Sequence, residues 1–139
     1  MMRQALTEAR AAAAEDEVPI GAVIVAGGRI IVRAHNMTEH LGDVTAHAEM
    51  QAITAAAATL GGKYLHDCTL YVTVEPCPMC AGALAWAQIG RIVYGAADPK
   101  RGYLRYSPAV LHPRTQVEAG VLAEESAQLV TEFFKGKRG

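Results

Sequence analysis

The segment "VEPCPMC", Val74–Cys80, places two of the three cysteines of the chain three residues apart, directly behind a proline. A disulfide, a redox pair and half of a metal site are three uses of such a pair, and each predicts something different elsewhere in the chain. A redox pair needs no further partner, whereas zinc needs three or four nitrogen or sulfur ligands. A third ligand is therefore sought among the five histidines.

His47 is the histidine in the most suitable place, because it lies in "TAHAEM" near the predicted start of a helix. Cys77 and Cys80 lie in the first turn of another predicted helix, whose free N–H groups favour thiolates. Helix starts that follow neighbouring strands meet at one edge of a sheet, so we expect His47 to approach the two cysteines. Three protein ligands leave one tetrahedral position for water, as in a catalytic zinc site.

Glu49, two residues after His47, supplies the carboxylate that such a site uses. Zinc lowers the pKa of a bound water to about 7, and a nearby carboxylate that is not a ligand can move the proton of that water. Two residues apart in a regular helix differ by about 200°, so the two side chains need an irregular first turn to reach one site. A zinc-stabilised RNA-binding module is an alternative, although it has no use for Glu49.

The composition is that of one globular domain over residues 1–139, with 51% hydrophobic and 19% charged residues. Three cysteines argue against a disulfide scaffold, and Cys68 is predicted to be a small buried side chain. We find no signal peptide and no apolar run of about 18 residues, so we expect a cytoplasmic protein without a membrane span.

Basic residues gather in two segments, although the net charge of the chain is −1. The stretch from Asp98 to Arg114 holds four basic residues and one acid, and the final "KGKRG" holds three basic residues and no acid. Segments of this kind can bind a short polyanion, or they can be solvated loop and tail residues.

Apolar periodicity and turn residues predict the elements that position these side chains. The predicted helices are Met2–Ala14, a helix over 46–60 capped by Thr45, a helix over 76–90 ended by Gly90, and Val121–Phe134. The predicted strands are Pro19–Ala26, Arg29–His35, Cys68–Val74, 91–97 and a weaker Gln116–Glu118.

This order predicts an α/β fold, with a mixed sheet of about five strands and helices on both faces. Gly27 and Gly28 join the first two strands as a hairpin, and the continuous apolar runs predict that both faces of both strands are covered. The two strand–helix–strand units are expected to be right-handed crossovers.

Four segments resemble the bacterial tRNA adenosine deaminases, zinc enzymes of the cytidine and deoxycytidylate deaminase superfamily: "EVPIGAVIV", "TAHAEM", "LYVTVEPCPMCAGAL" and "GRIVYGAAD". The resemblance runs from about Glu17 to Phe134. It implies a cytidine-deaminase-like three-layer α/β/α fold, a homodimer and one Zn²⁺ per chain. It also implies conversion of adenosine to inosine at the tRNA anticodon wobble position, with zinc-bound hydroxide attacking C6, a glutamate shuttling protons and ammonia released.

The resemblance assigns roles by position. His47, Cys77 and Cys80 would be the zinc ligands and Glu49 the proton shuttle. Asn36 and Asp98 would bind substrate, the first through the flipped base and the second through the flanking nucleotides. Without the resemblance, Asn36 is an ordinary turn residue and Asp98 a cap before a proline.

The tRNA anticodon stem–loop is the expected partner of the basic segments. Its candidate contacts are Lys100, Arg101, Arg105 and Lys135. Tyr103 and Tyr106 lie between the loop charges and could stack on splayed bases, or they could pack the loop on the core.

A free-base or nucleoside deaminase acting on guanine, cytosine or a related ring is the alternative function. Guanine deaminases resemble the chain around "EPCPMC" and "TAHAE", but they carry "GPFGAV" where this sequence has "VPIGAV". The chain also departs from the tRNA adenosine deaminases after Asp98, where "PKRGYLRYSP" replaces a segment that contains Gly-Ser, and at Ala97, where an arginine is often found. Both departures fall in the substrate rim.

Overall fold

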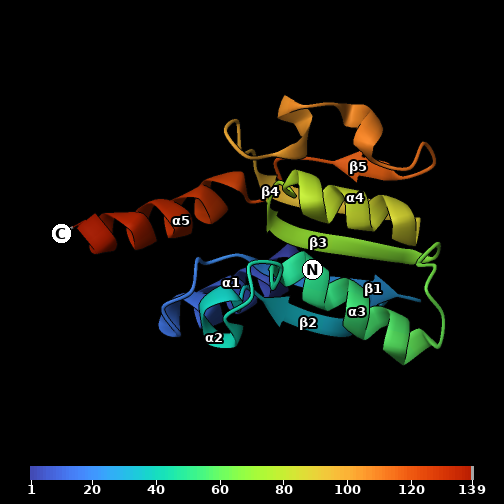
Figure 1. Cartoon of the computed structure of the whole chain (residues 1–139), viewed down its shortest axis with the longest axis horizontal. Coiled ribbons are helices and arrows are strands. Elements are labelled where there is room, and N and C mark those ends of the chain that lie inside the picture. Colours follow the sequence, from blue (N-terminus) through green and yellow to red (C-terminus); the bar gives the residue numbers. More distant parts are fainter. Residues whose placement is uncertain (139) are drawn as a thin grey trace.

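A computed structural model describes residues 1–138 and shows one five-stranded sheet with helices on both sides (Figure 1). The helices are α1 (Met2–Ala14), α2 (Thr38–Leu41), α3 (Ala48–Leu60), α4 (Pro78–Ala87) and α5 (Ala123–Arg138), with short 3-10 helices at Tyr103–Arg105 and Pro108–Val110. The strands are β1 (Gly21–Ala26), β2 (Arg29–His35), β3 (Cys68–Val74), β4 (Arg91–Ala96) and β5 (Gln116–Glu118). Within residues 1–138, no helix has the length and apolar character that crossing a bilayer requires.

The sheet is mixed, as predicted, and its strand order is β2-β1-β3-β4-β5. β1 pairs antiparallel with β2 and β3, whereas β3, β4 and β5 run parallel. Gly27 and Gly28 both have positive φ, 57° and 76°, which is the backbone of a tight hairpin turn. The hairpin and the short fifth strand are therefore confirmed.

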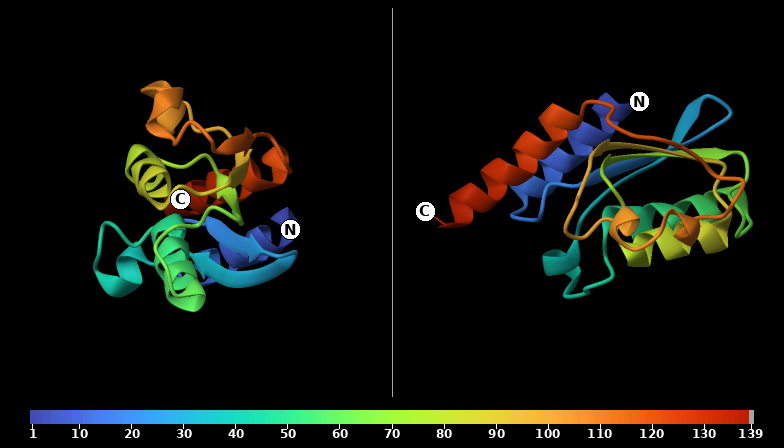
Figure 2. Two further views of the ribbon diagram at one scale, coloured as in Figure 1. Left: turned by 90° about the vertical axis from the view of Figure 1, so that its right-hand side faces the viewer. Right: turned by 90° about the horizontal axis from the view of Figure 1, so that it is seen from above.

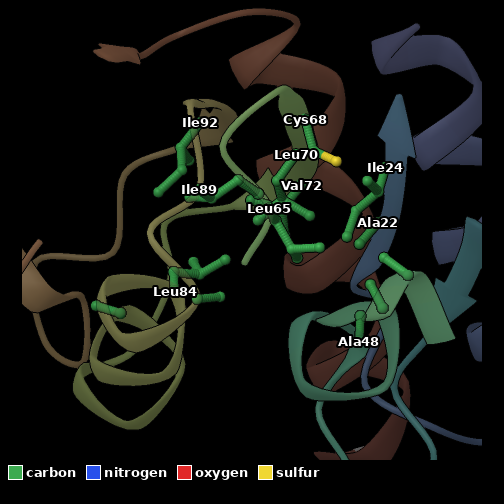
Figure 3. Packing of buried hydrophobic residues seen from close by; sticks show 14 of the residues in the cluster. Ala22, Ile24, Ala48, Leu65, Cys68, Leu70, Val72, Leu84, Ile89 and Ile92 are labelled. Atoms are coloured by element: carbon green, nitrogen blue, oxygen red, sulfur yellow. The ribbon is translucent and has the colours of Figure 1, made fainter. Parts of the chain in front are cut away.

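Helices cover the sheet in two layers, which confirms the three-layer α/β/α prediction. α1 and α5 pack on one face, and α3 and α4 lie side by side on the other (Figure 2). Ala22, Leu70 and Val72 of the sheet meet Ala48 and Leu84 of these two helices in the main core (Figure 3). Cys68 is 2% exposed in this core, as predicted.

The coverage predicted for the hairpin strands is complete for β1 and partial for β2, which α1 and α3 contact from opposite faces. Val23 and Ile24 of β1 point to opposite faces and both are fully buried. β2 is the edge strand, and Arg29 and Arg33 along it are exposed. An edge strand has a neighbour on one side only, so its arginines extend into solvent.

α1 sits directly on the start of β1. A Cβ at Gly21 would overlap the backbone of Ala5 and Ala9, so only glycine permits this separation of helix and strand. His35, at the end of β2, joins the same helix through its ring: Nδ1 lies 3.0 Å from Glu8 Oε1 and Nε2 lies 3.0 Å from Glu15 Oε2. The residue after His35 is Asn36, so this contact also fixes the end of β2 that faces the predicted site.

Several predicted helix boundaries are wrong, and the helix predicted as Val121–Phe134 spans Ala123–Arg138. Thr45 does not cap a helix, because its N–H and hydroxyl both donate to Asp43 Oδ1, at 2.8 Å and 2.7 Å. The chain turns at Val44 and Thr45, His47 has an extended backbone, and α3 begins at Ala48. α4 ends at Ala87, where Gln88 takes a left-handed conformation, and not at Gly90. Gly90 is required instead because a Cβ there would overlap the carbonyl oxygen of His66.

Replacing His35 with Gln is expected to destabilise the protein more at low pH than at high pH. Burial of the ring lowers the pKa of His35, but its bonds to Glu8 and Glu15 and their charges outweigh that effect, so the pKa is raised above 6.5. The stabilisation is therefore complete below the unfolded pKa and is lost as pH rises through the folded pKa. Urea unfolding across pH 5.5–9, an interval set about the ordinary pKa of histidine, measures it. His66→Gln, at an exposed histidine, is the control, and a pH-independent effect at His35 would contradict the ion pairing.

Candidate active site

The structure brings His47, Cys77 and Cys80 together. One ligand atom from each lies within 4.8 Å of the others, and His47 Nδ1 is 3.6 Å from Cys77 Sγ and 3.5 Å from Cys80 Sγ. Zinc bonds of about 2.0–2.1 Å to nitrogen and about 2.3 Å to sulfur, at a tetrahedral angle, require nitrogen–sulfur separations of roughly 3.5 Å. All three cysteines are free, and the structure pairs neither Cys77 nor Cys80 in a disulfide. The donor set and its spacing fit a tetrahedral metal ion.

Two helix starts create this cluster. His47 is the N-cap of α3 and Cys77 is the N-cap of α4, and both residues have extended backbones. Cys80 follows in the first turn of α4, and α3 and α4 pack against each other. Their N-terminal N–H groups and dipoles favour negative charge on the sulfurs.

The extended backbone of His47 also resolves the spacing of His47 and Glu49. His47 has φ −68° and ψ 155°, so it lies outside the helix, and Glu49 is the second residue within it. The separation of about 200° expected for a regular helix therefore does not apply. Both side chains can reach one site because the helix begins between them.

The pKa values of Cys77 and Cys80 are shifted in opposite directions. A hydrogen bond from Cys80, with further bonds to the His47 ring, lowers the pKa of Cys77 to about 4 although burial opposes it. The bond to Cys77, then burial and the nearby carboxylate of Glu49, raise the pKa of Cys80. The bond to Cys77 also raises the pKa of His47. These opposite shifts favour the anionic form at Cys77 over the anionic form at Cys80.

Glu49 is a buried carboxylate beside this cluster, only 3% exposed. Burial raises its pKa to about 7 and the Cys77 charge adds to this, whereas its own backbone N–H, the His47 charge and the Cys80 thiol act in the opposite direction. A carboxylate with a pKa near neutrality can both accept and return a proton at neutral pH. This is the property that the predicted shuttle requires.

Asn36 is buried at the end of β2, next to a carboxylate that the sequence interpretation missed. Its Nδ2 lies 3.5 Å from Glu17 Oε1 and from Thr38 Oγ1, which is the outer limit of a hydrogen bond. Glu17 is 1% exposed and accepts the N–H groups of Glu39 and His40, at 3.1 Å and 2.7 Å. Glu17 thereby ties the α2 turn to Asn36.

Asp98 lies after β4 and caps the turn that follows it. Its Oδ1 accepts the N–H groups of Lys100 and Arg101, at 3.2 Å and 3.0 Å. Its own N–H donates to Oε1 of Glu75, a second buried carboxylate that sequence reasoning missed. The signal for both missed residues was available: Glu17 and Glu75 each stand within two residues of a proline beside an apolar strand.

The basic loop, residues 98–105, presents its charges to solvent. Lys100, Arg101 and Arg105 are exposed, and Arg105 bonds the carbonyl oxygen of Lys100 at 2.9 Å. Tyr106 is 66% exposed, whereas Tyr103 is 2% exposed and belongs to the core. Base stacking by Tyr103 is therefore ruled out, because packing of the loop on the sheet covers its ring.

The last turns of α5 lie close to α2. A cavity of ≈ 630 Å³ opens between them, lined by residues of both helices and of the α1 end, among them Thr38, His40, Phe133 and Phe134. Lys137 pairs with Asp16 at 2.6 Å, and Lys135 is exposed. The side chain of Arg138 and all of Gly139 lie outside the described residues.

The sequence profile of the MafB19-like deaminases matches residues 1–138. The chain is 47% identical to the tRNA-specific adenosine deaminase of Agrobacterium fabrum over 142 residues, which cover 99% of this chain and 93% of the relative.

Two solved structures share the fold. One, from studies of A-to-I editing by tRNA:A34 deaminases at the wobble position, has a TM-score of 0.86 and 47% identity, covering 92% of this chain and 96% of that chain. The other, guanine deaminase from Bacillus subtilis, has a TM-score of 0.67 and 43% identity, covering 69% of this chain and 62% of that chain. With its His/Cys/Cys cluster and its buried glutamate at two helix starts, the chain belongs to the MafB19-like deaminase family.

Proposed function

We propose that the protein is a tRNA adenosine deaminase that converts adenosine to inosine at the anticodon wobble position. The observation that carries this proposal is a metal-ligand cluster with a buried Glu49 beside it, in a chain 47% identical over nearly its whole length to a tRNA-specific adenosine deaminase. The reaction consumes water: the C6–N6 bond of adenine breaks, a C6–O bond forms, and ammonia leaves. Residues 1–139 would act as one deaminase domain.

His47, Cys77 and Cys80 would hold one Zn²⁺ through Nδ1 and two Sγ atoms. The fit rests on the soft donors and on separations close to the edges of a zinc tetrahedron. Zinc bound in such a site lowers the pKa of a coordinated water to about 7. The positive ends of α3 and α4 stabilise the anionic form of the ligands, so the chain itself prepares the site for a cation.

Glu49 would carry the protons. Its burial holds the carboxylate away from bulk solvent, so a proton taken from the attacking water stays within the site. The same proton can then reach the departing N6 amino group, which leaves as neutral ammonia. A residue that serves both steps must exchange a proton without a large free-energy difference, as the raised pKa of Glu49 allows.

Asn36 and Asp98 would bind the substrate. Because the Nδ2 of Asn36 faces Glu17, its Oδ1 can accept a hydrogen bond from a base amino group. Asp98 caps the turn at the start of the basic loop and would contact the nucleotides that flank the target. Lys100, Arg101 and Arg105 would contact phosphates of the anticodon stem–loop, and Lys135 would add a contact from α5.

A homodimer in the cytoplasm is part of the proposal. Large apolar side chains are exposed on α4, where Trp86 is 86% exposed and Met79 is 37% exposed, and burial of such surface supports association. The cytoplasmic location follows from the proposed tRNA substrate.

A guanine or related free-base deaminase is the second candidate, favoured by 43% identity to a guanine deaminase over 69% of the chain. Incubation with a stem–loop carrying adenosine at the wobble position, and separately with free bases, distinguishes the two through ammonia release. Turnover of free guanine with an inert stem–loop would replace the proposed function with this candidate.

The purified protein is expected to contain about one zinc per chain, and His47→Ala and Cys80→Ala are expected to lose metal and thermal stability together. Cys68→Ala is the matched control, because Cys68 is buried in the core away from the cluster and its loss leaves the donors intact. Elemental analysis and melting curves measure both effects. Full zinc content in both ligand variants would eliminate this ligand set.

Glu49→Gln is expected to keep zinc and fold but to lose turnover by at least about 10²–10⁴-fold, because the amide is nearly the same size and cannot carry the proton. Single-turnover assays on the stem–loop with zinc-loaded protein give the rate. Glu124→Gln, at an exposed position in the first turn of α5, controls for removal of a carboxylate. A near-normal rate for Glu49→Gln would assign the proton transfers to another residue.

Replacement of Lys100, Arg101 and Arg105 by alanine is expected to weaken stem–loop binding and to reduce its salt dependence by up to about 2–3 units in the log–log slope. The three side chains are exposed, so zinc content and melting temperature should not change.

A control variant removes three exposed charges elsewhere: Arg10 on α1, Arg29 at the start of β2 and Lys63 in the loop after α3. Binding titrations at several salt concentrations compare the two variants. Equal losses from both would mean that the loop has no specific part in RNA binding.

A further inference from the structure

Glu75 is a buried carboxylate that the deamination chemistry does not use. It follows the last residue of β3, stands two residues before Cys77, and is 6% exposed. Each of its oxygens accepts a backbone N–H from the basic loop: Oε1 from Asp98 and Oε2 from Leu104, both at 3.1 Å. One side chain thus holds the loop near both of its ends.

Neighbouring backbone bonds support the same contact. The N–H of Glu75 donates to Ala96 at 2.8 Å, and the N–H of Tyr103 donates to the carbonyl oxygen of Pro76 at 2.9 Å. The chain from Asp98 to Leu104 therefore wraps around the Glu75 side chain and rests on the segment that leads to Cys77.

Gly102 shows how closely the loop approaches this carboxylate. A Cβ at position 102 would overlap Oε2 of Glu75. Its φ of −68° suits any residue, so the glycine is not required by the backbone conformation. It is required by the space that the carboxylate and the carbonyl oxygen of Asp98 occupy. This close approach of Gly102 to Oε2 is a second sign, beside the two hydrogen bonds, that the loop packs on the Glu75 carboxylate.

We propose that Glu75 is a positioning residue that sets the basic loop at a fixed distance and angle from the metal cluster, so that RNA phosphates meet Lys100, Arg101 and Arg105 while the base reaches the cluster. The inference rests on the proposed function. Its physical basis is that residues 75–77 carry both the loop anchor and a metal ligand, with a single proline between them. The loop and the cluster therefore share one rigid support.

Glu75→Gln tests the anchor with little change in size. A carboxylate accepts hydrogen bonds at both ends, whereas an amide accepts at one end and presents N–H₂ at the other. One of the two loop N–H groups then faces a donor and loses its partner.

We expect KM for the stem–loop to rise roughly 5- to 100-fold, by the cost of one unpaired buried donor, with kcat changed much less. Zinc content should be unchanged, and amides of 98–104 should exchange hydrogen faster than in the wild type. The salt dependence of binding should fall, because the three cations no longer align with the phosphates.

Gly102→Ala provides a second route to the same contact from the loop side and serves if Glu75→Gln does not fold. The added methyl group must displace Oε2, so the variant should also raise KM. Gly62→Ala is the matched control, because a Cβ there meets no atom within 4 Å. An unchanged KM in Gly102→Ala would contradict a tight anchor.

A double-mutant cycle separates positioning from simple destabilisation. Glu75→Gln is introduced into wild-type protein and into the variant in which Lys100, Arg101 and Arg105 are alanine. If Glu75 acts through these cations, its substitution should raise KM in the first background and have little effect in the second. An equal effect in both backgrounds, or an unchanged KM in the first, overturns the inference while wild-type activity on the stem–loop upholds the proposed function. Lack of wild-type activity on the stem–loop would contradict the proposed function, and with it the RNA role of Glu75.

Discussion

The start of α3 and the start of α4 meet at one edge of the sheet, and the site depends on this meeting. His47 is the N-cap of α3 and Cys77 is the N-cap of α4, and both have extended backbones. Their ligand atoms lie together with that of Cys80. The helices then hold that place with their packing against the sheet and against each other. Their positive ends favour the thiolate on Cys77 and any anionic ligand atom beside it. Packing of the core thus holds the residues of the cluster in place.

Sequence patterns predicted the helices on both faces of a mixed sheet, the β1–β2 hairpin and the residues of the cluster, because these depend on apolar periodicity and on residue types that have few other uses. They did not predict where α3 begins, since Thr45 is a good cap that bonds to Asp43 instead. Glu17 and Glu75 were missed for a related reason: a glutamate is normally solvated, and only tertiary contacts reveal that backbone N–H groups surround it. Tyr103 is a different case, because the sequence left base stacking and packing on the core open, and the burial of its ring shows that it packs on the core.

Two buried carboxylates each hold a segment beside a proposed substrate-binding residue. Glu17 holds the α2 turn beside Asn36, and Glu75 holds the loop that carries the basic residues. A carboxylate suits this task because it accepts several N–H groups that would otherwise be unpaired inside the protein. The exposed residues of these segments can therefore vary while the buried carboxylate contacts stay the same. The difference between an RNA substrate and a free base would then lie in the exposed residues of these segments.

Deamination of the wobble adenosine by water is tested by following the oxygen atom of water into the product. Zinc-loaded protein is incubated in ¹⁸O-labelled water with free guanine and with an anticodon stem–loop whose wobble nucleoside is adenosine. The nucleosides and bases are then separated, and their masses are measured by mass spectrometry. A deaminase specific for the wobble adenosine should produce inosine that carries one ¹⁸O atom from water. The other adenosines of the stem–loop and the free guanine should remain unchanged. Labelled xanthine formed from guanine, with an unchanged stem–loop, would contradict this specificity for the wobble adenosine.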